Sequence, residues 1–178
     1  FASTDKTREL WPHEFRLEYE IRIGELLTLT LRTENLGDAS FRYEQALHTY
    51  LAVGDVRQIT VEGLGATEYI DKTDAMKRKR LEENTLRITG ETDSVFLNTG
   101  ATCIVDDPVL QRRIVIEKEG SQTTVVWNPW PEKIKTMPDL DPADWTKYVC
   151  VETCNVKENA LTLAAGQSHT MRAIVLVA

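Results

Sequence analysis

The sequence predicts an all-β protein whose antiparallel sheets pack face to face as a β-sandwich. Apolar and polar residues alternate along most of the chain, which is the pattern of strands with one buried face. Helical periodicity is scarce and indicates only one helical turn, near residues 142–145, where Asp141 is placed to cap it. These observations predict strands joined by turns, with few helices.

The first expected element is a β-hairpin that begins at Phe15. Five apolar residues at every second position, from Phe15 to Ile23, share one face, and Gly24-Glu25 forms the turn before a second alternating run at Leu27 to Leu31. Further strands are expected over residues 41–53, 56–61, 94–97, 101–105, 113–118, 123–127, 147–156 and 169–177. The Glu119-Gly120-Ser121 turn is expected to join two of these strands as another hairpin.

The most polar segment, residues 71–83, is expected to be a long solvated loop. Its basic run from Lys77 to Arg80 resembles an anion-binding patch, but acidic residues lie within a few positions and neutralise it. These acidic residues are Asp71, Asp74, Glu82 and Glu83.

Length and charge exclude several classes of protein. A chain of 178 residues with 42% hydrophobic content and no internal linker predicts one β-sandwich domain over residues 1–178. The net charge of -7 argues against nucleic acid or an anionic membrane as a partner, because both attract basic surfaces. No apolar run approaches the roughly 20 residues that span a bilayer.

The cysteines predict a cytoplasmic protein without a disulfide framework or a metal site. Cys103, Cys150 and Cys154 are expected to be buried and reduced. A zinc site formed by Cys150, Cys154 and His169 is rejected, because two residues four positions apart on one strand are separated by roughly 13 Å. His169 is instead expected at the surface.

Two of the predicted strands each carry one residue suited to proton transfer. His48 shares a face with Ala46 and Tyr50, and Glu152 shares a face with Tyr148, Cys150 and Cys154. An imidazole exchanges protons near neutral pH, and burial raises the pKa of a carboxyl group toward that range. An acid and base pair lining a cleft is therefore one interpretation. The other is an interior hydrogen-bonded histidine and a solvent-facing glutamate.

Four segments, in order along the chain, resemble the aldose 1-epimerase family and, within it, the branch of hexose-6-phosphate mutarotases. They are QALHTYLAVGDVRQITVEGLGATEYID, ETDSVF, VVWNPW and YVCVE, and the resemblance extends from about Trp11 to the C-terminus. It implies a galactose mutarotase-like β-sandwich (supersandwich). Because Phe1 rather than Met comes first, we expect the C-terminal part of a larger mutarotase-like domain, incomplete at its N-terminus. Most phosphate-binding arginines of the family would then precede Phe1.

The resemblance implies an isomerase that interconverts the α and β anomers of a hexose 6-phosphate in the cytoplasm without a cofactor. It assigns the general acid to His48 and the general base to Glu152. Asp93 matches an aspartate that binds sugar hydroxyls, although aspartates also commonly precede strands as turn residues. Trp127 is a candidate to pack against the sugar, or equally to pack in the core. A mutarotase for an unphosphorylated aldose, a non-catalytic carbohydrate-binding β-sandwich and a purely structural module are the alternatives.

Two other motifs are given structural interpretations. His13, in the sequence Trp11-Pro12-His13, has no evident part in catalysis and is expected to be structural. Gly63 and Gly65 follow a predicted strand, but no helical pattern comes after them, so a dinucleotide-binding loop is excluded.

Overall fold

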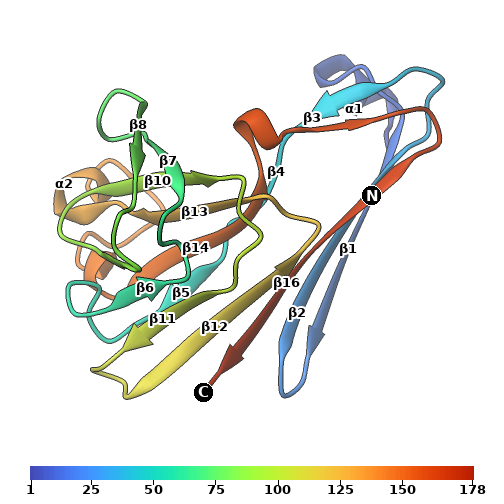
Figure 1. The fold of residues 1–178 in the computed structure, drawn as a ribbon. Helices are drawn as coiled ribbons and strands as arrows, with labels where there is room; N and C mark the ends of the chain where they lie inside the picture. The colour runs from blue at the N-terminus through green and yellow to red at the C-terminus, as the bar shows by residue number, and fades with distance from the viewer.

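Two antiparallel sheets of seven strands each form most of the molecule, which a computed structural model describes over residues 1–178 (Figure 1). In spatial order, the first sheet contains β1 (Phe15–Ile23), β2 (Leu27–Asn35), β16 (Ser168–Val177), β12 (Arg112–Glu119), β11 (Cys103–Asp107), β6 (Thr60–Glu62) and β9 (Thr85–Arg87). The second contains β4 (Gln45–Leu47), β14 (Tyr148–Asn155), β13 (Thr123–Asn128), β10 (Thr92–Leu97), β7 (Glu68–Asp71) and β8 (Lys77–Arg80), and β5 (Tyr50–Ala52) also pairs with β14.

The remaining elements are short. β3 (Phe41–Tyr43) and β15 (Leu161–Leu163) form a two-stranded sheet. The α-helices are α1 (Asp5–Leu10) and α2 (Trp130–Ile134), and the 3₁₀ turns are η1 (Asp144–Thr146) and η2 (Lys157–Asn159). None of these helices is long and apolar enough to cross a membrane. The prediction of an all-β antiparallel fold is therefore confirmed.

The main hydrophobic core lies between the two sheets. Val126 and Val151 of the second sheet and Val105 of the first belong to one cluster of buried apolar side chains. Because successive side chains of a strand point to opposite faces, the neighbours Val125 and Glu152 lie on the outer face of the second sheet. The core therefore fixes which residues of β13 and β14 face away from it.

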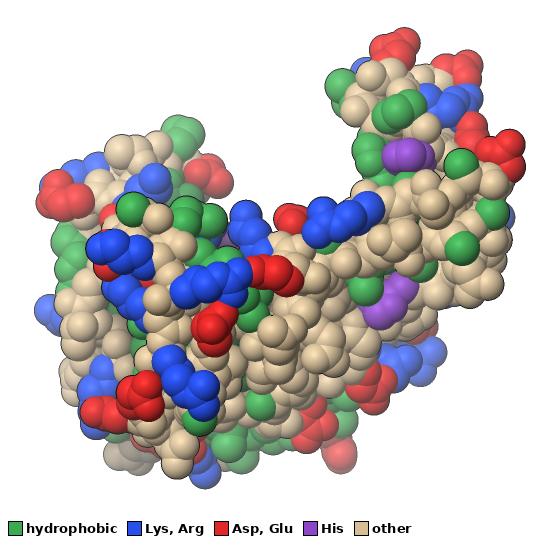
Figure 2. All heavy atoms as spheres, turned by 45° about the horizontal axis from the view of Figure 1, so that its top comes forward, with side chains coloured by type: hydrophobic (Ala, Val, Ile, Leu, Met, Phe, Trp, Pro, Cys, Tyr) green, Lys and Arg blue, Asp and Glu red, His purple; other side chains and the backbone are tan.

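The hairpin of β1 and β2 extends beyond the sandwich together with β16 (Figure 1). This arm also carries α1, β3 and β15, and a broad hollow separates it from the rest of the molecule in Figure 2. The hairpin has the predicted turn and alternation. Its outer strand β1 nevertheless leaves Tyr19, Ile21 and Ile23 exposed.

Several predicted boundaries were wrong. The strand expected over residues 41–53 is divided into β3, β4 and β5, and residues 56–61 contain a turn before β6 rather than one strand. The short strands β7, β9 and β15 were not predicted, because three or four residues are too few to show alternation. The helical turn near Pro142 is the 3₁₀ turn η1. Its N-cap is Ala143 rather than the predicted Asp141, whose Oδ1 instead accepts a hydrogen bond of 2.8 Å from the Ala143 amide.

The segment expected as a solvated loop contains a strand. β8 is the basic run itself, and it pairs with β7 at the edge of the second sheet. Lys79 Nζ lies 2.7 Å from Asp71 and 2.9 Å from Asp74, and Arg78 pairs with Glu68. Neutralisation of the basic run by Asp71 and Asp74 is confirmed. Cross-strand ion pairs allow this charged sequence to form an edge strand.

Candidate active site

Strand pairing brings His48 and Glu152 opposite each other. β4 pairs with β14 at Leu47 and Thr153, and β5 pairs with the same strand at Tyr50 and Cys150. The register is the same on both sides of the two residues between β4 and β5, His48 and Thr49, so His48 lies directly opposite Glu152 of the neighbouring strand. Directly opposed residues project from the same face. The two side chains therefore meet although the residues lie far apart along the chain.

The imidazole and the carboxyl group are in contact. His48 Nε2 lies 3.1 Å from Glu152 Oε1. The side chain of His48 is 47% exposed, whereas that of Glu152 is only 8% exposed. Burial raises the pKa of the Glu152 carboxyl group above its ordinary value, and the facing His48 opposes part of this rise. The pair thus combines a solvent-accessible imidazole with a carboxyl group that takes up a proton more readily than an exposed glutamate.

Asp93 supplies a second carboxylate beside this pair. β10 pairs with β13 so that Asp93 lies opposite Trp127. Asp93 Oδ2 lies 2.7 Å from Lys72 Nζ, and the Lys72 amide donates a hydrogen bond of 3.0 Å to the Asp93 carbonyl oxygen. Asp93 Oδ1 is buried without a hydrogen-bond partner. One carboxylate oxygen is therefore held by lysine and the other remains an unused acceptor.

Trp127 lies within an aromatic group around the imidazole. Its ring centroid is 5.7 Å from that of His48 in an edge-to-face arrangement, and Tyr50 stacks on His48 at 5.0 Å. Tyr148 stacks on Trp127 at 6.1 Å and lies 5.2 Å from Tyr50. Aromatic faces of this kind restrict the motion of the imidazole and offer an apolar surface to a ligand.

One cavity of about 390 Å³ contains all four predicted site residues: His48, Glu152, Asp93 and Trp127. Its other lining residues are Glu44, Ala46, Lys72, Val95, Val125, Cys154, Val156 and Lys157. The cavity lies on the outer face of the second sheet, away from the main core. Sequence reasoning therefore identified candidates that the fold brings together.

Sequence reasoning missed Lys72 as part of this cavity, and it placed Cys154 on the face of Glu152 without giving it a role in the site. Lys72 follows β7, a strand too short to be recognised, so nothing in the sequence indicated that it lies close to Asp93. Cys154 is two residues from Glu152, and both side chains line the same cavity, as the alternation predicted. Its thiol donates a long hydrogen bond of 3.7 Å to Glu152 Oε2.

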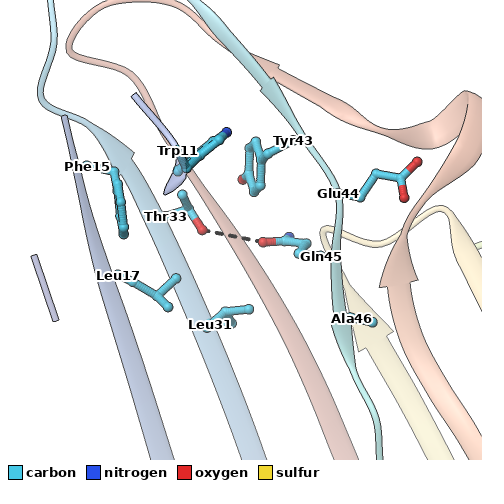
Figure 3. A pocket seen from close by; sticks show the side chains of 9 residues that line it. All are labelled: Trp11, Phe15, Leu17, Leu31, Thr33, Tyr43, Glu44, Gln45 and Ala46. Atoms are coloured by element: carbon cyan, nitrogen blue, oxygen red, sulfur yellow. Dashed lines mark hydrogen bonds between the residues drawn. The ribbon is translucent and has the colours of Figure 1, made fainter. Parts of the chain in front are cut away.

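A second cavity adjoins the first at Glu44 and Ala46 (Figure 3). It has a volume of about 470 Å³ and lies where the arm meets β4. Its walls are mainly apolar, and a hydrogen bond of 3.4 Å from Thr33 to Gln45 crosses it. Glu44 is its only charged lining residue. This cavity has no acid and base pair, so the candidate site is the smaller one.

The other histidines lie outside the site. His13 packs between Trp11 and Phe41, with centroid distances of 4.8 and 5.0 Å, which confirms a structural position. His169 is half-buried rather than fully at the surface, because its Nε2 lies 2.7 Å from the Gly120 carbonyl oxygen.

The cysteines are all buried and unpaired, as predicted. No group of three or more histidine, cysteine, aspartate or glutamate side chains is arranged to hold a metal ion.

A structural requirement explains the glycine at position 63. Its φ is +96°, and an added Cβ would meet the Thr102 carbonyl oxygen at 2.1 Å.

Comparison with known proteins identifies similar chains along nearly the whole sequence. A sequence profile of the family described as aldose 1-epimerase matches residues 1–175. The chain is 32% identical over 163 residues to a Cenchrus ciliaris protein provisionally named glucose-6-phosphate 1-epimerase, covering 89% of this chain and 49% of that protein. The chain thus spans about half the length of the curated relatives it matches.

Solved structures show the same fold. A crystal structure of YeaD from Salmonella typhimurium, described provisionally as a mutarotase, superimposes with a TM-score of 0.91 at 29% identity, over 100% of this chain and 58% of that one. Galactose 1-epimerase from Lactobacillus acidophilus superimposes with a TM-score of 0.73 at 10% identity, over 100% of this chain and 61% of that one. The expected galactose mutarotase-like sandwich is confirmed.

Proposed function

The chain belongs to the aldose 1-epimerase family, and from this membership we propose that it interconverts the α and β anomers of a hexose. The observation that carries the proposal is the 3.1 Å contact between His48 and Glu152 inside a cavity. In a pyranose the anomeric hydroxyl and the ring oxygen are bonded to the same carbon. An acid and a base that act on both oxygens must therefore lie close together, as this imidazole and this carboxyl group do.

The proposed reaction opens and closes the sugar ring. Glu152, as a carboxylate, removes the proton of the anomeric hydroxyl, while His48, as an imidazolium, donates a proton to the ring oxygen. The bond between C1 and the ring oxygen breaks, and its electron pair stays on that oxygen. Rotation about the C1–C2 bond then presents the other face of the aldehyde, and the reverse proton transfers close the ring. No atom or electron is gained or lost over the cycle.

The surroundings of the pair support this assignment. Burial favours the uncharged form of Glu152, which makes its carboxylate a better proton acceptor than that of an exposed glutamate. Asp93 Oδ1 is available to accept a hydrogen bond from a sugar hydroxyl, because it has no other partner. Trp127 offers an aromatic face at the same cavity. We therefore propose sugar-binding roles for Asp93 and Trp127.

We propose a hexose 6-phosphate as the substrate, and a cytoplasmic setting. The name of the Cenchrus relative supports the phosphosugar. Of the two lysines that line the cavity, Lys72 is paired with Asp93, and Lys157 is the cation that could contact an anionic group of the ligand. The three buried, unpaired cysteines fit a reducing compartment.

The test is anomer exchange in the intact protein, followed by exchange NMR with glucose 6-phosphate and with glucose. Loss of either proton-transfer group should reduce the rate by ~10²- to 10⁴-fold, so His48→Ala and Glu152→Gln are the informative variants. Glu132→Gln is the matched control, because this glutamate is exposed and pairs only with Lys135. Its rate should equal that of the wild type.

The outcomes separate the candidate functions. Unchanged rates in both His48→Ala and Glu152→Gln contradict the proposed chemistry. Binding of the sugar without any exchange identifies a non-catalytic carbohydrate-binding sandwich instead. Faster exchange of glucose than of glucose 6-phosphate contradicts the phosphosugar but keeps the mutarotase.

A further inference from the structure

We propose that Cys154 is a positioning residue of the active site, whose thiol holds the Glu152 carboxylate in the orientation that receives a proton. This inference rests on the proposed function for its catalytic meaning. The contact on which it stands is independent of that function. It concerns a side chain that neither touches His48 nor is needed to complete the acid and base pair.

The geometry gives each oxygen of Glu152 its own partner. Oε1 lies 3.1 Å from His48 Nε2, and Oε2 accepts the hydrogen bond of 3.7 Å from Cys154 Sγ. A carboxylate held at both oxygens has a fixed plane, whereas one held only by His48 is free to rotate about the bond to its side chain. Fixing this plane aligns the lone pair that takes the substrate proton.

The strand holds the sulfur atom in place. Cys154 is fully buried and lies opposite Thr123 on one side and Ala46 on the other. Its carbonyl oxygen also accepts a hydrogen bond of 2.7 Å from the Ser121 hydroxyl. Since Cys154 and Glu152 are two residues apart on β14, their side chains share one face. The thiol therefore reaches the carboxylate through a rigid stretch of backbone.

The protonation state of the sulfur suits a hydrogen-bond donor. Burial and the neighbouring carboxylate raise the pKa of the Cys154 thiol far above its ordinary range. The group thus remains S–H at every pH at which the enzyme would work. It can donate to Glu152 but does not compete with it as a base.

Other charged groups also act on Glu152, and a substitution at Cys154 leaves them in place. His48 faces it from the gap between β4 and β5, Lys72 follows β7, and Asp93 belongs to β10. His48 and Lys72 lower the pKa of Glu152, while Asp93 and burial raise it. Removal of the thiol donor should therefore raise this pKa, because one interaction with the charged form is lost.

The experiment compares Cys154→Val with Cys150→Val in the intact protein. Cys150 is the matched control, because it is a fully buried cysteine on the same face of β14 that makes no hydrogen bond to Glu152. Valine preserves the apolar packing of Cys154 against Val95 and Val125 but has no donor. The acidic limb of the kcat/KM profile for anomer exchange should move upward by about 0.5–1 pH unit in Cys154→Val alone.

Cys154→Ser tests whether the donor is what matters. Its hydroxyl restores a hydrogen bond to Glu152, so the acidic limb should return toward the wild-type position. A purely structural cysteine would instead give reduced stability and an unmoved limb in both substitutions. That result, or equal shifts in Cys154→Val and Cys150→Val, would overturn the proposal.

Two measurements do not depend on activity. The midpoint of the Glu152 carboxyl group, followed by ¹³C NMR, should rise in Cys154→Val even if the wild type shows no anomer exchange. In the wild type, the infrared S–H band that disappears in Cys154→Ser should lie at lower frequency than the band lost in Cys150→Ser. If the Cys154 band were not shifted, the contact between this thiol and Glu152 would be contradicted. This test does not require Cys154→Val to fold. If the protein shows no anomer exchange but the Glu152 midpoint and the S–H band behave as expected, only the proposed function is contradicted.

Discussion

Burial and the neighbouring charges act in opposite directions on the pKa of Glu152. Burial disfavours its charged form, whereas His48 and Lys72 favour it. Burial prevails, so this carboxyl group takes up a proton at a higher pH than an exposed glutamate does. The same burial that raises its pKa also makes it a stronger base, and this links the pH dependence of the proposed reaction to a single residue.

Activity should therefore fall on the acidic side at a midpoint above the ordinary carboxyl value of 4.5. The proposed base must be ionised, and protonation removes it as the pH decreases through its raised pKa. The measurement is the pH profile of kcat/KM for anomer exchange. A midpoint at or below 4.5 would contradict the assignment of Glu152 as the base.

Lys72→Met should weaken substrate binding. The substitution removes the ion pair with Asp93 Oδ2, while the backbone hydrogen bond between the two residues remains. Asp93 then loses the orientation in which we propose that it binds the sugar, and KM should rise about tenfold with a smaller change in kcat. The acidic limb should also move upward, because Lys72 lowers the pKa of Glu152.

Lys79→Met is the matched control for Lys72→Met. Lys79 also pairs with carboxylates, those of Asp71 and Asp74, but it does not line the cavity. Its substitution should leave KM and the acidic limb unchanged. Equal effects of the two substitutions would show that general charge, rather than the contact with Asp93, controls binding.

Among the elements, the turn after β6 depends on a residue without a side chain. Gly63 has a φ of +96°, and its backbone approaches the Thr102 carbonyl oxygen so closely that a Cβ has no room. Gly63→Ala should destabilise the protein by about 2 kcal/mol or more, since both strain and a clash oppose it. Denaturant unfolding measures this change.

Gly90→Ala is the control for that substitution. No atom lies within 4 Å of a Cβ built at Gly90, so its replacement should change stability by less than about 1 kcal/mol. If Gly63→Ala were as well tolerated as Gly90→Ala, the close approach to Thr102 would not constrain this turn.

Long strands could be predicted from the sequence, whereas short ones could not. The strands β1, β2 and β14 are eight or nine residues long, and the alternation within them predicted each one. β7 and β8 have four residues each, and the charges of β8 resemble a loop until its partner strand is known. Charge pairing across strands is a property of the fold, so no local pattern indicates it.

The candidate site shows the same division between local and distant information. Alternation placed His48 and Glu152 on the less aliphatic faces of their strands, and this proved correct. The prediction that they act together came only from the family resemblance, because pairing between distant strands leaves no local pattern. For the same reason Lys72 was missed, since its partner Asp93 belongs to another strand.

At the scale of the whole molecule, the arm leaves a strand with exposed apolar side chains at the edge of a sheet. Tyr19, Ile21 and Ile23 are 51%, 53% and 85% exposed on β1. The first residues of β1 also pair with residues 1–3, but the part of β1 that carries these three side chains pairs only with β2. Exposed apolar edge strands favour pairing with other chains. The 178-residue chain should therefore self-associate as its concentration rises.

Replacing Ile21 and Ile23 together by lysine should reduce this self-association. Lysine adds charge and removes apolar surface from the edge, and sedimentation velocity over a range of concentrations measures the effect. Glu132→Lys changes charge on α2, away from the arm, and should not alter the association. A double variant that associates as strongly as the wild type would show that another surface is responsible.

The constant register on both sides of the gap between β4 and β5 also determines which changes in chain length the site tolerates. Insertion or deletion of one residue between Leu47 and Tyr50 would disturb the alternation of side chains between the two faces of the sheet, which directs the imidazole outward. It would turn His48 toward the interior or shift it away from Glu152. The spacing of this gap should therefore be more strictly preserved among active relatives than the identity of Thr49, which contributes no atom to the cavity.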